Sequence, residues 1–140
     1  MNVFFDDSII IASLLSPTGG SSKLISYVHA GKIRGITSQT VIDEVLSHSL
    51  KIGLSEQKIL TFIVESKLLV RKRIIGKEIE SISKHMIDPD DAHVFAGAIL
   101  TSSDILISLD KKHILHPDIQ IQFSTLDICS PKELLSQLDL

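Results

Sequence analysis

Four acidic residues stand at places where apolar segments of the chain begin, end or pass into a helix, namely Asp6, Glu44, Asp91 and Asp110. They lie far apart in the sequence, but an α/β fold can bring strand ends and helix starts together at one edge of a sheet. Carboxylates gathered there repel each other, by about 4 kcal/mol for two unit charges about 4 Å apart at an effective dielectric constant of about 20. A divalent cation would offset this repulsion, and Mg²⁺ prefers oxygen ligands of this kind. The pattern therefore predicts a divalent-metal site and the phosphate chemistry that such ions support.

Two of these acids come directly after apolar segments that are predicted strands. Asp6 follows residues 3–5, and Asp110 follows residues 105–109. Ligands bind beyond the carboxyl ends of the strands in open parallel sheets, so both acids fall at the expected edge. A helix cap is the structural alternative for Asp6, and Asp7 is equally able to serve as that cap. Asp6 is the better candidate for a metal ligand because it ends the strand.

The other two acids belong to predicted helices. Glu44 lies within residues 39–48, on a flank of the apolar face, where a solvent-facing role is the structural alternative. Asp91 opens an apolar helix at residues 91–101, where a favourable contact with the helix dipole is the alternative. Each acid alone has a structural explanation, but the four together favour one shared site. His93 is expected to pack or to face solvent rather than to bind metal.

The elements that must position these acids alternate between strands and helices. Strands are predicted at residues 3–5, 33–37, 104–108 and 119–123, with 68–75 as an edge strand or an extended connector. Helices are predicted at residues 8–15, 23–30, 39–48 with Thr40 as its cap, 55–66, 77–85, 91–101 and from Ser130-Pro131 to the end of the chain. This alternation predicts a three-layer α/β/α fold with a mainly parallel central sheet of four to five strands. Residues 1–140 are expected to form a single domain.

Composition sets limits on the class of protein. Of the 140 residues, 44% are hydrophobic and 22% are charged, as in ordinary globular proteins. The net charge of −3 disfavours a protein that coats DNA, because phosphate contacts need a basic face. The one cysteine, Cys129, excludes an internal disulfide and indicates a reducing compartment. No apolar run approaches the roughly 20 residues that span a bilayer, so we expect a cytoplasmic location and no membrane partner.

Four motifs, taken in order, resemble those of PIN-domain nucleases over residues 2–115 of the chain. They are residues 5–8 with the first acid and its turn, 41–46 with a single Glu, 88–98 with the third acid, and 105–111 with a strand that ends in Ser-x-Asp. The chain departs from the family at Asp7, Ser8 and Leu109, where the family's motifs have Thr, Asn and Gly. All four principal acids are retained.

The resemblance implies a Mg²⁺- or Mn²⁺-dependent endoribonuclease that hydrolyses single-stranded RNA. The implied metal ligands and catalytic residues are Asp6, Glu44, Asp91 and Asp110, with Ser108 as a further catalytic residue that orients a water or a phosphate. Ser8, Lys111 and Lys112 are implied contacts to the substrate. The PIN proteins of similar length are small bacterial toxins of type II toxin–antitoxin modules. This likeness implies an antitoxin protein and a second copy of the chain, in a homodimer, as partners.

A PIN fold that no longer cleaves and only binds RNA or a protein partner is the alternative, and the departures at Ser8 and Leu109 keep it open. Two other classes of protein are disfavoured by missing residues. A response-regulator receiver needs a phospho-accepting Asp at the end of a middle strand, and residues 50–60 contain none. A phosphatase with an Asp-x-Asp motif needs a second Asp two positions beyond Asp6, where this chain has Ser8.

Overall fold

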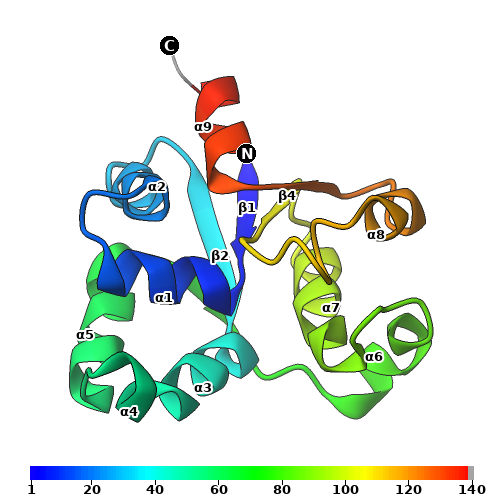
Figure 1. Ribbon diagram of the computed structural model, residues 1–140, viewed down its shortest axis with the longest axis horizontal. Helices are drawn as coiled ribbons and strands as arrows, with labels where there is room; N and C mark the ends of the chain where they lie inside the picture. Colours follow the sequence, from blue (N-terminus) through cyan, green and yellow to red (C-terminus); the bar gives the residue numbers. More distant parts are fainter. Residues whose placement is uncertain (139–140) are drawn as a thin grey trace.

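The computed structural model describes residues 1–138, which form a central parallel sheet with helices around it (Figure 1). The strands are β1 (Asn2–Phe5), β2 (Arg34–Ser38), β3 (Leu69–Arg71), β4 (Ile105–Ile107) and β5 (Asp127–Cys129). Their order in the sheet is β3-β2-β1-β4-β5, and every neighbouring pair is parallel. The predicted three-layer α/β/α fold is confirmed, with five strands in a sheet that is wholly rather than mainly parallel.

Helices cover both faces of this sheet. They are α1 (Asp7–Leu15), α2 (Gly20–His29), α3 (Gln39–Ser47), α4 (Ser49–Ile52), α5 (Glu56–Ser66), α6 (Gly76–Ser83), the 3₁₀ turn η1 (Pro89–Asp91), α7 (Ala92–Leu100), α8 (Pro117–Gln122) and α9 (Pro131–Leu138). Figure 1 shows α1, α2 and α5 on one side of the sheet and α6, α7 and α8 on the other. The short helix α4 was not predicted, and the predicted continuation of α9 to residue 140 lies outside the described residues. In the part of the chain that the structure describes, no helix has the length and apolar character needed to cross a membrane.

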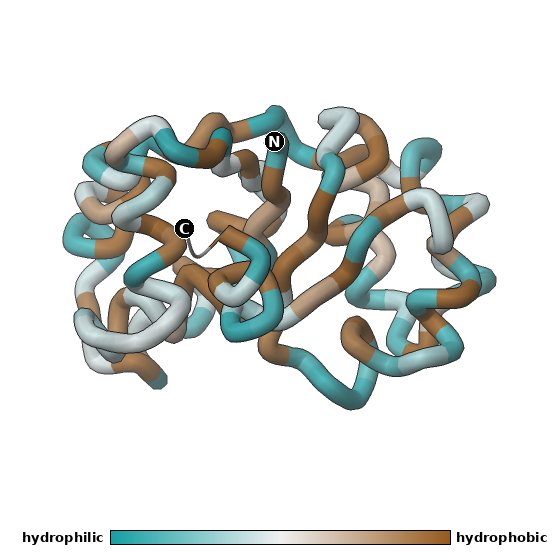
Figure 2. The backbone as a smooth tube through the Cα atoms, turned by 90° about the horizontal axis from the view of Figure 1, so that it is seen from above, coloured by the Kyte–Doolittle hydropathy of each residue, from teal (hydrophilic) through white to brown (hydrophobic). Residues whose placement is uncertain are grey.

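The centre of the sheet is apolar because β1 and β4 are continuous hydrophobic runs. Val3, Phe4 and Phe5 of β1 are fully buried, as are Leu106 and Ile107 of β4. Such runs are typical of parallel strands that helices cover on both faces. Figure 2, which looks along a perpendicular direction, shows these hydrophobic strands in the middle of the molecule. This core fixes the carboxyl edge of the sheet, where the predicted acids follow β1 and β4.

The helix α7 packs directly on β1 through a glycine. A Cβ atom at Gly97 would lie 2.6 Å from Cζ of Phe4, closer than side-chain atoms can approach. The absence of a side chain at position 97 therefore sets how near α7 comes to the sheet. Because Asp91 and His93 stand at the start of this helix, the same contact sets the depth at which they reach the carboxyl edge.

The prediction of a strand at residues 119–123 is wrong. Most of this segment belongs to α8, and the last strand of the sheet is β5. Pro117 occupies the first position of α8, and the Nδ1 atom of His116 accepts a hydrogen bond from the backbone N–H of Asp118 at 3.1 Å. Ile119 is 2% exposed and Ile121 is 75% exposed, so the helix buries only one of its two isoleucines. In a short segment, this alternation of apolar and polar residues looks the same in a helix and in a strand.

The predicted cap of α3 is also wrong. The side chain of Ser38, not of Thr40, accepts a hydrogen bond from the backbone N–H of Val41 at 3.1 Å. Thr40 instead accepts one from the backbone N–H of Ile74 at 2.9 Å, and so ties the segment after β3 to the start of α3. The segment at 68–75 contains the edge strand β3, as one of its two predicted alternatives.

Candidate metal centre

Asp6 follows β1 and is fully buried. Its Oδ1 atom accepts hydrogen bonds from the Ser8 hydroxyl at 2.6 Å and from the backbone N–H of Ile9 at 3.1 Å, so Asp6 caps α1. Its Oδ2 atom accepts from the Ser108 hydroxyl at 2.5 Å. Burial raises the pKa of Asp6 to about 7, against the opposing effect of the hydrogen bonds from Ser108 and Ser8. The structure thus assigns the cap to Asp6 rather than to its neighbour.

The two serines connect Asp6 to the end of β4. The Ser8 hydroxyl accepts a hydrogen bond from the backbone N–H of Leu109, and the Ser108 hydroxyl accepts one from the backbone N–H of Asp110, each at 3.0 Å. Residues Phe5 and Ile107 are register partners in the sheet, which is why the residues that follow them meet. Both hydroxyls therefore point toward the first acid and hold the backbone that carries the fourth.

Asp110 is half-buried and organises the turn after it. Its Oδ1 atom accepts hydrogen bonds from the backbone N–H groups of Lys112 at 3.1 Å and His113 at 3.0 Å. Its Oδ2 atom lies 3.3 Å from Nδ1 of His113. Lys111 and Lys112 are exposed on the outside of this turn. The turn therefore brings one carboxylate and one imidazole into contact and leaves two lysines exposed.

The hydrogen bonding of the Asp91 carboxylate is incomplete. Its Oδ2 atom is buried and has no hydrogen-bond partner in the described part of the chain. Burial raises the pKa of Asp91 to about 6, and the negative charges of Asp88, Asp110 and, more weakly, Asp7 raise it further, while His113 lowers it. One ligand atom from each of Asp88, Asp91 and His113 lies within 4.8 Å of the others. Asp91 therefore stands among groups that a cation would hold together.

Glu44 reaches the site from α3 and meets His93 of α7. The Oε1 atom of Glu44 is in contact with Nε2 of His93, and His93 is only 9% exposed. Burial raises the pKa of Asp7, and the charge of Glu44 raises it further while His93 lowers it. The charge of Asp7 also raises the pKa of Asp91, so Asp7 is near enough to interact with both Glu44 and Asp91.

The predicted acids thus occupy one region but in different surroundings. Among the described residues, Asp91 is the one predicted acid in the group whose ligand atoms lie within 4.8 Å of one another. Asp110 contacts His113 of that group, and Asp6 joins Asp110 through Ser108. Glu44 lies outside the group, and its charge acts on Asp7.

Four further residues of this region, Asp7, Asp88, His93 and His113, were not predicted as ligands; Asp7 was considered as a helix cap and His93 as a packing or solvent-facing residue. His93 carried one available signal, since it is the only polar residue in the buried segment 92–98.

The donor set fits a divalent ion. Carboxylate oxygens suit Mg²⁺ and Mn²⁺, and the unpartnered oxygen of Asp91 is one that a cation would satisfy. Asp88 and His113 are placed to contribute beside Asp91. The acids that remain charged near neutral pH would be stabilised by such an ion, because it removes their mutual repulsion.

A largely apolar groove of about 640 Å³ lies next to the turn at Asp110. Leu109 and Lys111 line one side, and Lys132 and Leu135 of α9 line another. This arrangement puts two lysines at the rim, close in sequence to the fourth acid.

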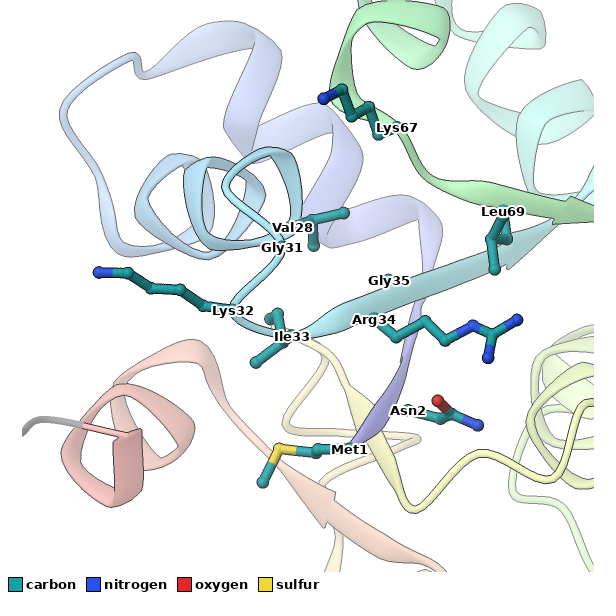
Figure 3. A pocket seen from close by; sticks show the side chains of 10 residues that line it. All are labelled: Met1, Asn2, Val28, Gly31, Lys32, Ile33, Arg34, Gly35, Lys67 and Leu69. Carbon is teal, nitrogen blue, oxygen red and sulfur yellow. The ribbon is translucent and has the colours of Figure 1, made fainter.

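A second hollow, of about 490 Å³, lies at the amino edge of β1 and β2, away from the acids. Three cations line it, Lys32, Arg34 and Lys67. Figure 3 shows their side chains pointing in different directions, and the ammonium group of Lys32 lies 4.9 Å from the centre of the Tyr27 ring. The hollow therefore gathers no positive charge at one point.

Among models of known protein families, the one described as PIN domain matches residues 2–112 of the chain. No curated protein sequence matches it.

Three solved structures are similar in fold. One is VapBC2 from Rickettsia felis bound to a DNA fragment from their promoter, with a TM-score of 0.63 at 12% identity over 93% of this chain and 98% of that one. A toxin–antitoxin complex from Klebsiella pneumoniae has a TM-score of 0.60 at 19% identity, over 89% of this chain and 94% of that one. VapC20 from Mycobacterium tuberculosis, a toxin that cleaves the sarcin–ricin loop, has a TM-score of 0.56 at 16% identity, over 79% and 91%.

Proposed function

The chain belongs to the PIN-domain family, and from this premise we propose that it is a divalent-metal-dependent endoribonuclease that hydrolyses phosphodiester bonds of single-stranded RNA. The observation that carries the proposal is the buried, unpartnered oxygen of Asp91. It stands where Asp88, Asp110 and His113 supply further ligand atoms or charge. A protein with no use for a cation would gain stability by giving this oxygen a hydrogen-bond donor.

Mg²⁺ or Mn²⁺ is the proposed ion. Asp91 and Asp110 would hold it, with Glu44 and Asp6 contributing as the family resemblance implies. When bound, such an ion supplies Lewis acidity toward a phosphate oxygen and an activated water for hydrolysis.

The other residues of the proposed site have roles that the chain itself can perform. Asp6, Ser8 and Ser108 hold the backbone at Leu109 and Asp110, and so fix where the fourth carboxylate points. In addition, Ser8 is proposed to contact the substrate, and Ser108 is proposed to orient a water or a phosphate. Lys111 and Lys112 are exposed beside the acids and could neutralise backbone phosphates of an RNA strand.

The biological setting proposed is that of a toxin in a type II toxin–antitoxin module that acts on RNA in the cytoplasm. The structural neighbours include toxin–antitoxin complexes, which supports an antitoxin protein as a partner. A homodimer is proposed on the family resemblance alone.

The direct test is cleavage of single-stranded RNA with added Mg²⁺ or Mn²⁺. Wild-type protein should cleave, and Asp91→Asn should not. Asp90→Asn is the matched control, because Asp90 is an exposed acid next to Asp91 whose side chain makes no contact with the group described above. Equal cleavage by wild type and Asp91→Asn would contradict the proposal.

The second candidate is a PIN fold that binds RNA or a protein without cleaving. One observation favours it: both oxygens of the buried Asp6 are already occupied by hydrogen bonds. This candidate predicts RNA binding that Asp91→Asn leaves unchanged, with no cleavage at any concentration of Mg²⁺ or Mn²⁺.

A further inference from the structure

His93 is a buried histidine with almost no polar groups in contact with its ring. It lies on the first turn of α7, in a segment whose other residues, 92–98, are all apolar. Among the described residues, neither ring nitrogen makes a well-formed hydrogen bond, and the one polar contact is between Nε2 and Oε1 of Glu44. Burial of an imidazole without partners is unfavourable. A residue that only filled space here would be better replaced by an apolar one, so the contact with Glu44 explains the histidine.

Glu44 needs such a partner. Its side chain is 38% exposed, and within residues 1–138 no other side chain or backbone donor bonds its carboxylate. Asp7 lies near enough for the two negative charges to interact, and Asp7 in turn acts on Asp91. Left to itself, the Glu44 carboxylate would turn away from Asp7 into solvent.

We propose that His93 is a positioning residue that holds the Glu44 carboxylate beside Asp7 and thereby directs it toward the metal centre. The inference rests on the proposed metal-dependent function and assigns to α7 a second task besides carrying Asp91. Groups that orient a ligand in this way commonly change metal affinity by about 10- to 100-fold when they are removed. His93 acts through Glu44 and touches no reacting atom.

Three variants separate positioning from packing. His93→Phe keeps an aromatic ring of similar size and removes both nitrogens, whereas His93→Gln keeps an N–H donor that can reach a carboxylate. His48→Phe is the matched control, because Nδ1 of His48 contacts the backbone carbonyl of Glu44 at 2.8 Å and not its carboxylate. Circular dichroism and thermal melting establish that each variant is folded.

The first readout is the dissociation constant for Mn²⁺, measured by calorimetry without RNA. His93→Phe should bind Mn²⁺ about 10- to 100-fold more weakly than wild type. His93→Gln should recover most of that loss, and His48→Phe should bind like wild type. Wild-type affinity in a folded His93→Phe would overturn the inference while leaving the proposed function intact. A wild-type protein that binds no Mn²⁺ would overturn both.

The second readout needs no metal. The ¹⁵N chemical shifts of the His93 ring report which nitrogen carries the proton, and a contact with Glu44 favours the proton on Nε2. Glu44→Gln should shift these resonances, because the charged acceptor is lost, and should leave those of His48 in place. Unchanged His93 resonances in Glu44→Gln would show that the two side chains do not interact, and would overturn the inference independently of any activity.

Discussion

Asp6 and Asp91 belong to the same candidate metal centre, but the protein surrounds them differently. The Asp6 carboxylate accepts three hydrogen bonds, from two serine hydroxyls and one backbone N–H, and it caps a helix. The Asp91 carboxylate has a buried oxygen with no donor and lies near other acids. The first arrangement is complete without a ligand, whereas the second is complete only when a cation arrives. Within one site, the fold and the proposed chemistry thus depend on different carboxylates.

The largest expected effect is the loss of cleavage in Asp91→Ala. We expect kcat/KM for RNA to fall by about 100- to 1,000-fold, the range found when one group that stabilises developing charge is removed. The melting temperature of the metal-free protein should stay the same or rise, because an unpartnered buried oxygen is gone. Cleavage kinetics and thermal melting measure the two quantities. A large drop in melting temperature would show that Asp91 has a structural role like that of Asp6.

The next effect is on stability as a function of pH. Burial raises the pKa of Asp6 to about 7 and of Asp91 to about 6, both above the ordinary value of 3.8. The folded protein therefore binds more protons than the unfolded chain between these values, so metal-free stability falls as the pH rises from about 4 to about 7. Each pKa unit corresponds to about 1.4 kcal/mol, and the raised pKa values of both groups contribute to this loss in the same direction.

Denaturant titrations at several pH values check this sign. The double variant Asp6→Asn/Asp91→Asn should flatten the dependence in that window. The pKa of Glu78 is lowered to about 2 by its bond to Arg71, so the contribution of that acid changes only at lower pH and does not interfere. A stability that rose between pH 4 and pH 7 would contradict the raised pKa values.

Metal binding should have a somewhat smaller effect. Mn²⁺ at about 100 times its dissociation constant should raise the free energy of unfolding by about 2.7 kcal/mol, through linkage to the folded state. Asp91→Ala should abolish most of this gain, because it removes the oxygen that has no other partner. Urea unfolding with and without Mn²⁺ measures it. An equal gain in the variant would place the ion elsewhere.

The smallest of these effects concerns Asp6→Ala. The loss of a helix cap and of the acceptor for two serine hydroxyls should lower the free energy of unfolding of the metal-free protein by about 1–2 kcal/mol. The removal of a desolvated charge offsets part of the loss, so the effect should be greater at pH 5 than at pH 8. Urea unfolding at the two pH values measures it. If Asp6→Ala were as stable as wild type at pH 5, the hydrogen bonds around Asp6 would not contribute as described.

Much of the fold follows from local sequence patterns. The strands β1, β2 and β4 and most of the helices were predicted because each is a run of one hydrophobic pattern between clear breaks. The strand at the far edge, β5, was missed because it begins with the exposed Asp127 and has only two buried residues, while the apolar alternation before it belongs to α8. The cap of α3 was misassigned because both Ser38 and Thr40 are able to cap, and the choice between them depends on where β2 ends.

The candidate site was predicted less completely than the fold. Asp6, Asp91 and Asp110 could be selected because each stands at an element boundary, whereas Glu44 lies inside α3 and was selected only as part of the wider pattern. The contact between Glu44 and His93 joins α3 to α7, and no local pattern in the sequence records a meeting between these helices. Which of two adjacent aspartates caps α1 depends on the backbone angles at their junction, and the residue types do not determine those angles.

The close fit of Gly97 against Phe4 has a consequence for how this chain can change over time. A single added methyl group at position 97 would push against the fully buried aromatic ring of Phe4. The relief would come from displacing α7, and with it the start of the helix nearly two turns away. A mutation at position 97 could therefore inactivate the protein without changing any acidic residue of the proposed site. Inspection of the acids alone would not distinguish an active sequence from an inactive one.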